Sequence, residues 1–100
     1  MGSRLMKVMG VGRIDEFGRK HANAKERLAA WLHEAKETVW RSTQDVKDRY
    51  ATASFLPENR VVFNIGGNKY RLLVQIAYNT ETVIVLKVGT HEEYNRWKLR

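Results

Sequence analysis

The sequence predicts an α+β fold, in which an N-terminal strand and helices precede an antiparallel three-strand meander and a short C-terminal helix. Two observations support this prediction: an amphipathic helical stripe in the first half, and three runs of β-branched and aromatic residues in the second. Because the helices precede the strands instead of alternating with them, they are expected to pack on one face of the sheet. One hundred residues with 43% hydrophobic content suffice for a single domain over 1–100.

The first elements are short. Lys7–Gly12 is apolar enough for a strand. Asp15 is expected to cap a brief helix that ends near His21, and Asn23 is expected to cap the longer helix that follows.

The longer helix has the clearest periodicity in the chain. Its apolar residues recur about every 3.6 positions and form one stripe, which predicts a helix packed on a core. The stripe comprises Leu28, Trp31, Leu32, Ala35 and Val39, and the opposite side carries Glu26, His33, Glu34, Glu37 and Arg41. Ser42, with Asp45 three residues later, predicts a capping box that opens a short helix to about Tyr50.

Three strands are predicted in succession at Val61–Ile65, Tyr70–Tyr78 and Thr82–Val88. The connections Gly66-Gly67-Asn68 and Asn79-Thr80-Glu81 have the length and composition of hairpin turns, which predicts the antiparallel meander. Thr90 and Glu93 have the spacing of a capping box and predict the last helix.

Composition narrows the classes of function. The formal net charge of +7 makes nucleic acid, an anionic membrane surface or an acidic protein a plausible partner. The absence of cysteine excludes disulfides, thiolate chemistry and cysteine-ligated zinc. No apolar run approaches the ~20 residues that span a bilayer, so a cytoplasmic protein without a membrane partner is expected. Residues 1–5 are given no functional role and are treated as a segment that need not be native, because Met6 would serve equally well as the start.

Alternation along the strands predicts one fully apolar face and one mixed face. The mixed face would bring together Asn64, Arg71 and Gln75, and the Thr90 turn would deliver His91 nearby. The result would be a polar concavity on the sheet.

RNA cleavage without a metal needs a group that activates the ribose 2′-hydroxyl, a cation that stabilises the phosphorane and an acid for the leaving oxygen. Arg71 can hold two phosphate oxygens with its planar fork. His91 would lie in the first turn of a helix, where backbone N–H groups favour an anion. Tyr94 would project from the same helical face and could donate a proton or stack on a base.

Each of these residues also has a purely structural interpretation. His91 could be a surface residue or a secondary cap, and Tyr94 could anchor the core together with Trp97. Arg71 could be a solvated strand residue paired with a carboxylate.

The other candidate motifs carry no expected function. His21 and His33 have no partner at ligand spacing, so no metal is expected. Gly66-Gly67 lacks the strand-loop-helix context of a phosphate-binding loop, and no cofactor is expected.

Two segments, Val62–Leu72 and Val88–Tyr94, resemble the HigB family of type II toxins, and Met6–Phe17 is similar as well. The paired motifs are Asn-x-Gly-Gly-Asn-x-x-Arg-Leu and Gly-Thr-His-x-Glu-Tyr. The resemblance implies a RelE-like fold and metal-independent cleavage of translated mRNA in the ribosomal A site, which would inhibit translation. It also implies a HigA-type helix-turn-helix antitoxin, with DNA contacted only indirectly through the toxin-antitoxin complex.

Carried over residue by residue, the resemblance implies a catalytic set and a set of RNA contacts. The catalytic set is Arg71, His91, Tyr94 and Lys69, and the RNA contacts are Asn64, Asn68 and Gln75. Asn95 stands where the family commonly carries Asp, a nearly isosteric change. The alternatives are a non-catalytic basic RNA-binding module and a structural partner in an acidic complex.

Overall fold

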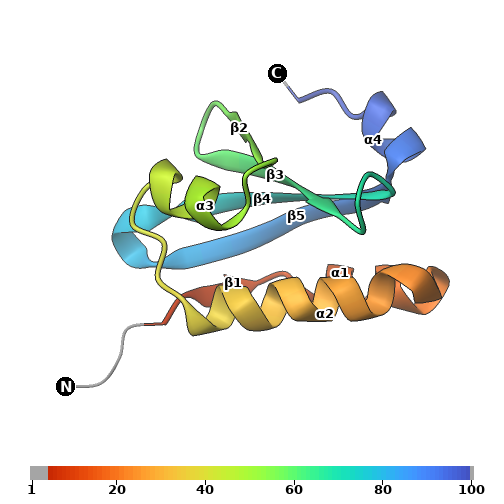
Figure 1. Ribbon diagram of the computed structural model, residues 1–100, viewed down its shortest axis with the longest axis horizontal. Coiled ribbons are helices and arrows are strands. Elements are labelled where there is room, and N and C mark those ends of the chain that lie inside the picture. The colour runs from red at the N-terminus through yellow and green to blue at the C-terminus, as the bar shows by residue number, and fades with distance from the viewer. Residues whose placement is uncertain (1–4, 100) are drawn as a thin grey trace.

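The computed structural model describes residues 5–99, and within them five strands form one mixed sheet in the order β1-β5-β4-β3-β2. The strands are β1 (Lys7–Met9), β2 (Ser54–Leu56), β3 (Arg60–Ile65), β4 (Tyr70–Ala77) and β5 (Thr82–Thr90). The helices are α1 (Val11–Lys20), α2 (Ala22–Glu37), α3 (Thr43–Arg49) and α4 (His91–Arg96), with a 3-10 turn at Tyr78–Thr80. Figure 1 shows α1 and α2 on one side of the sheet and α4 on the other. Of the opening segment 1–5, residues 1–4 lie outside the described range.

The α+β class predicted from the sequence is confirmed, and the sheet is larger than predicted. β3, β4 and β5 are antiparallel neighbours. At one edge β1 joins β5 in parallel, and at the other the unpredicted β2 pairs antiparallel with β3. β2 has only three residues, too few for alternation to identify a strand.

The start of α1 differs from the prediction. The helix begins at Val11, not after Asp15, so the predicted strand Lys7–Gly12 ends three residues early. Gly10 precedes the helix with φ 81°, and a Cβ at this position would lie 2.6 Å from the carbonyl oxygen of Val85. The chain therefore turns where only glycine fits, and no capping side chain is needed.

Replacement of Gly10 should destabilise the protein, whereas the same change two residues later should not. Gly10→Ala forces a left-handed backbone and a contact with β5, and we expect a loss of about 1–3 kcal/mol in the free energy of unfolding. Gly12 lies inside α1 with open space around it, so Gly12→Ala should add about 0.5–1 kcal/mol. Urea unfolding followed by circular dichroism measures both, and equal effects of the two substitutions would contradict this account.

α2 begins and ends earlier than predicted. Asn23 is not its N-cap, because His21 alone separates the two helices and its backbone N–H donates to the Phe17 carbonyl. The helix ends at Glu37, and the extended backbone of Thr38 places Val39 and Arg41 beyond it. The apolar stripe is confirmed as core-facing within the helix, since Leu28, Trp31 and Ala35 are buried.

The core lies between the sheet and the two long helices. Its sheet side is the predicted apolar face, formed by Val61, Phe63, Ile65, Tyr70, Leu72, Val74 and Ile76. Phe63 lies at its centre, with ring centroids 5.4 Å from Trp31, 5.9 Å from Trp40 and 5.0 Å from Tyr50. Aromatic packing thus joins α2, β3 and the end of α3.

The predicted cap of α3 is confirmed with one change of partner. Ser42 Oγ accepts from the Asp45 backbone N–H, while Asp45 Oδ2 accepts from the N–H of Arg41 instead of Ser42.

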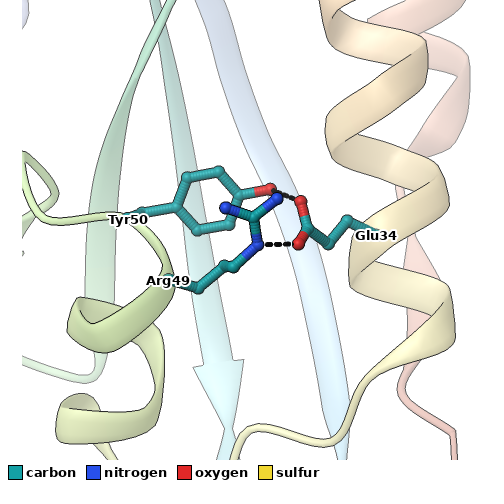
Figure 2. A network of polar contacts seen from close by, with 3 residues as sticks. All are labelled: Glu34, Arg49 and Tyr50. Carbon is teal, nitrogen blue, oxygen red and sulfur yellow. Dashed lines mark hydrogen bonds and ion pairs between the residues drawn. The ribbon is translucent and has the colours of Figure 1, made fainter.

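α3 is tied to α2 by a polar network around Glu34, drawn in Figure 2. One carboxylate oxygen accepts from the Tyr50 hydroxyl at 2.7 Å, and the other accepts from Arg49 Nε. Burial raises the pKa of Tyr50 above its ordinary value, and the hydrogen bond to Glu34 raises it further. The folded protein therefore holds Tyr50 in its protonated form.

This raised pKa predicts a loss of stability at alkaline pH. The unfolded chain ionises tyrosine near pH 10, whereas the folded protein resists ionisation. The stabilisation is complete below about pH 10 and is lost as the pH rises toward the folded-state pKa. We expect the free energy of unfolding to fall more steeply above about pH 10 in the wild type than in Tyr50→Phe. Urea titrations at several alkaline pH values test this, and parallel slopes would refute it. Tyr78, whose pKa burial also raises, is present in both proteins.

Candidate functional site

The β3–β4 hairpin and the β5–α4 junction lie against each other and define the candidate site. In the register of the sheet, Arg71 faces Gly89 and Tyr70 faces Thr90. The His91 backbone N–H donates to the Lys69 carbonyl at 2.9 Å, which fixes the start of α4 on the hairpin. Here two segments that are distant in the sequence come together.

The predicted capping box of α4 is confirmed. Thr90 Oγ1 accepts from the Glu93 N–H at 3.1 Å, and Glu93 Oε1 accepts from the Thr90 N–H at 2.8 Å. The box sets His91 as the first residue of the helix. Since α4 has only six residues, the positive charge of this site comes from Arg71 and not from a helix terminus.

Among the described residues, Arg71 is the one charged residue that is buried, with 7% of its surface exposed. Its Nη1 donates to the carbonyls of Asn68 (3.0 Å) and Tyr70 (3.2 Å). Its Nη2 donates to Asn68 Oδ1 at 3.2 Å and lies 3.1 Å from His91 Nδ1. Within residues 5–99 no carboxylate pairs with it, so the interpretation as a solvated residue in an ion pair is wrong.

These partners leave the positive charge of Arg71 unneutralised. Carbonyl and amide oxygens satisfy guanidinium hydrogen bonds but carry no full negative charge. A buried cation without a counter-ion is costly, and a bound anion would relieve that cost. The site is therefore suited to bind an anion such as a phosphate group.

The contact with Arg71 fixes the tautomer of His91. Arginine has donors only, so His91 Nδ1 must be the acceptor, and the ring proton then lies on Nε2. With Nδ1 as the acceptor, Nε2–H is the donor of the ring. A doubly protonated ring would lose the bond to Arg71.

Tyr94 lies beneath the guanidinium of Arg71. The arginine Cζ is 5.1 Å from the centre of the tyrosine ring, a cation–π distance. Tyr94 is half-buried and lies outside the hydrophobic core cluster, as does Trp97, whose ring centroid is 5.6 Å away. The interpretation of Tyr94 as a core anchor is therefore wrong.

The remaining predicted residues have separate positions. Asn68 contacts Arg71, and Lys69 is exposed on the hairpin. Asn64 faces Arg71 in the register, but its amide donates to the Thr52 carbonyl. Gln75 is four residues further along β4, about 13 Å from Arg71, and donates to the Glu58 carbonyl. The structure thus gathers Asn68 with Arg71 and keeps Gln75 apart.

Sequence reasoning missed Trp97 and Lys87 as members of this neighbourhood. Lys87 Nζ lies 5.5 Å from the centre of the Trp97 ring. Gly89 carries the signal that could have revealed them, because a Cβ there would lie 2.7 Å from Trp97 Cζ2. Glycine at this position makes room for the indole beside the site.

Residues 5–99 hold neither a cluster of metal ligands nor a membrane-spanning helix. No group of three or more histidine and acidic side chains has the arrangement of a metal site. No described helix is long and apolar enough to cross a membrane.

Comparison with protein-family models gives one match. The model for HigB toxins, described as the RelE-like toxic component of a toxin-antitoxin system, matches residues 24–97. The matched segment contains α2 from Ala24 onward, the β3–β4 hairpin and the β5–α4 junction. No curated protein matches the chain significantly.

Proposed function

The chain belongs to the HigB family of RelE-like toxins, the toxic components of toxin-antitoxin systems, and from this premise we propose that it is a ribosome-dependent endoribonuclease of translated mRNA. The observation that carries the proposal is the buried Arg71 guanidinium, which has no carboxylate partner and touches both His91 and Tyr94. In this proposal residues 1–100 act as a single RelE-like domain in the cytoplasm and need no metal.

Arg71 would bind the phosphate that is cleaved. Both of its Nη atoms are engaged by protein acceptors, so a phosphate held through two oxygens must displace at least one of them. His91 Nδ1 is the acceptor that a phosphate can replace without moving the hairpin, because the other three acceptors belong to Asn68 and Tyr70. The charge-assisted bond to phosphate is also stronger than the bond to an uncharged acceptor that it replaces. Phosphate binding would thus free the lone pair of Nδ1.

The freed imidazole would then act as the base. Nδ1 takes the proton of the ribose 2′-hydroxyl, the 2′-oxygen attacks phosphorus, and the bond from phosphorus to the 5′-oxygen breaks. The products are a 2′,3′-cyclic phosphate and a 5′-hydroxyl. Arg71 and the new imidazolium stabilise the charged phosphorane, Tyr94 is the candidate proton donor to the 5′-oxygen, and Lys69 adds positive charge at the hairpin.

The partners follow from the same premise. Membership of the family implies an antitoxin, which we propose to be a helix-turn-helix protein of the HigA type that alone contacts DNA. The net charge of +7 favours the phosphates of mRNA and of ribosomal RNA at the A site. Asn64 and Gln75, engaged with backbone carbonyls, would reach RNA only after release from those bonds.

One observation favours the alternative of a non-catalytic basic RNA-binding module. The Nη groups of Arg71 are saturated by the protein, an arrangement that suits a structural arginine as well as a catalytic one. A binding module would bind RNA without cleaving it.

Toe-printing of a translated message with purified ribosomes separates the two functions. A toxin should produce new 5′ ends within the A-site codon when the message is translated, and no new ends when ribosomes are omitted. His91→Ala should abolish these ends while the protein keeps its melting temperature. Intact transcripts with the wild-type protein would exclude the enzyme and favour the binding module.

A further inference from the structure

A cleft of about 330 Å³ lies beside the free part of β5, where α1 and the segment after α4 approach the strand. β1 pairs only with Thr82–Ile84, so the stretch Leu86–Val88 lines the cleft without a strand neighbour on that side. We call this the β5-edge cleft. Its size is at the lower end of the range for small-ligand pockets.

The β5-edge cleft is connected to the candidate site by aromatic and cationic side chains. The guanidinium of Arg71 lies 5.1 Å from the Tyr94 ring. Tyr94 and Trp97 are 5.6 Å apart, and Lys87 lies 5.5 Å from the Trp97 ring. Trp97 and Lys87 both line the cleft, so two aromatic rings flanked by two cations lead from Arg71 into it.

Trp97 is placed for contact with a ligand. The other two tryptophans, Trp31 and Trp40, are each 2% exposed and belong to the core. Trp97 is only half-buried, lies outside the core cluster and rests over Gly89. A large aromatic ring held at a cleft without serving the core is a stacking platform.

The charges of the cleft favour an anionic ligand. Arg13, Lys20 and Lys87 line it, against the carboxylates of Glu16 and Glu93. One oxygen of the Glu93 carboxylate accepts from the Thr90 N–H. His21, stacked on Phe17 at 4.2 Å, adds a second aromatic surface.

We propose that the β5-edge cleft binds one nucleotide of single-stranded RNA adjacent to the cleaved phosphate, with its base on Trp97 and its phosphate at Lys87. Single-stranded RNA is held by this combination, since every base has a face that stacks and every phosphate a charge that lysine neutralises. A peptide strand fits the cleft less well, because α1 packs along β5 beside it. The inference rests on the proposed function, for which it supplies a substrate subsite.

The intrinsic fluorescence of Trp97 tests the subsite directly. A short 2′-O-methylated RNA binds without being cleaved, because its 2′-oxygens cannot attack. It should quench part of the wild-type fluorescence and protect the half-buried Trp97 from acrylamide. Trp97→Phe should lose this response, since the remaining tryptophans are buried. Trp97→Ala should weaken binding roughly tenfold, and Trp97→Phe should retain most of the affinity.

Lysine variants give a matched comparison. Lys87→Ala should weaken RNA binding. It should also reduce the slope of the logarithm of the association constant against the logarithm of the salt concentration by about one unit or less. Lys36→Ala removes the same charge from an exposed position of α2 outside the cleft and should change neither quantity beyond a small nonspecific loss. Thermal melting checks that every variant is folded.

The outcomes separate the subsite from the proposed enzyme. An RNA response at Trp97 without cleavage on ribosomes supports the subsite and overturns the proposed function. Cleavage that is unchanged in Trp97→Ala, without any RNA response, overturns the subsite and leaves the function standing. Protection of Trp97 by the purified antitoxin but not by RNA would also overturn the RNA subsite, because the cleft would then be a protein-binding surface.

Discussion

Arg71→Ala is expected to abolish growth arrest and to reduce ribosome-dependent cleavage at least about a hundredfold, the usual cost of losing a group that stabilises transition-state charge. Arg71→Lys should fail nearly as completely. A lysine keeps the charge but loses the planar fork that reaches Asn68 and His91 together. Induced expression with growth curves measures toxicity, and toe-printing measures cleavage.

Arg60 provides the matched control for this prediction. It is a partly buried arginine of β3 whose Nε and Nη2 donate to the carbonyls of Pro57 and Leu99 and not to a residue of the catalytic set; in the sheet its register partner is Gln75. Arg60→Ala should cost some stability and leave cleavage within a few-fold of the wild type. A folded Arg71→Ala protein that still arrests growth would remove Arg71 from the mechanism.

The elements predicted best from the sequence are those whose signals are local. Thr90 and Glu93 form the predicted capping box because both partners lie within one turn of each other. The stripe on α2 marks the core face because its period repeats within the helix. The turn at Gly10 was missed because its cause, the carbonyl oxygen of Val85, is distant in the sequence.

The sequence predicted that Arg71 and His91 lie near each other but not how they are bonded, and Gln75, predicted beside them, lies apart. Alternation and register place Asn64 opposite Arg71, as the strand pattern indicated. The burial of Arg71 and its bonds to Asn68 and His91 depend on how the hairpin packs against α4. No local sequence pattern predicts that packing. The structural alternative placed Trp97 in the core with Tyr94, because helical spacing alone cannot tell a core residue from one that lines a cleft.

Loss of toxicity can also arise from loss of the fold, and Phe63 is where we expect the largest effect of this kind. Phe63→Ala removes a fully buried ring that contacts Trp31, Trp40 and Tyr50. Large-to-small changes of this type cost about 3–5 kcal/mol, a large share of the roughly 5–15 kcal/mol that stabilises a small domain. The variant should be largely unfolded or rapidly degraded in cells.

Phe55→Ala is the control, because Phe55 is only partly buried on the edge strand β2. It should cost less than half as much in urea unfolding, and the protein should stay toxic. Phe63→Ala is expected to lose toxicity together with its folded population, whereas Arg71→Ala should lose toxicity while remaining folded. If Phe63→Ala unfolds at the urea midpoint of the wild type, the aromatic cluster does not hold α2 and α3 on the sheet, and the rigid support of the hairpin must come from elsewhere in the core.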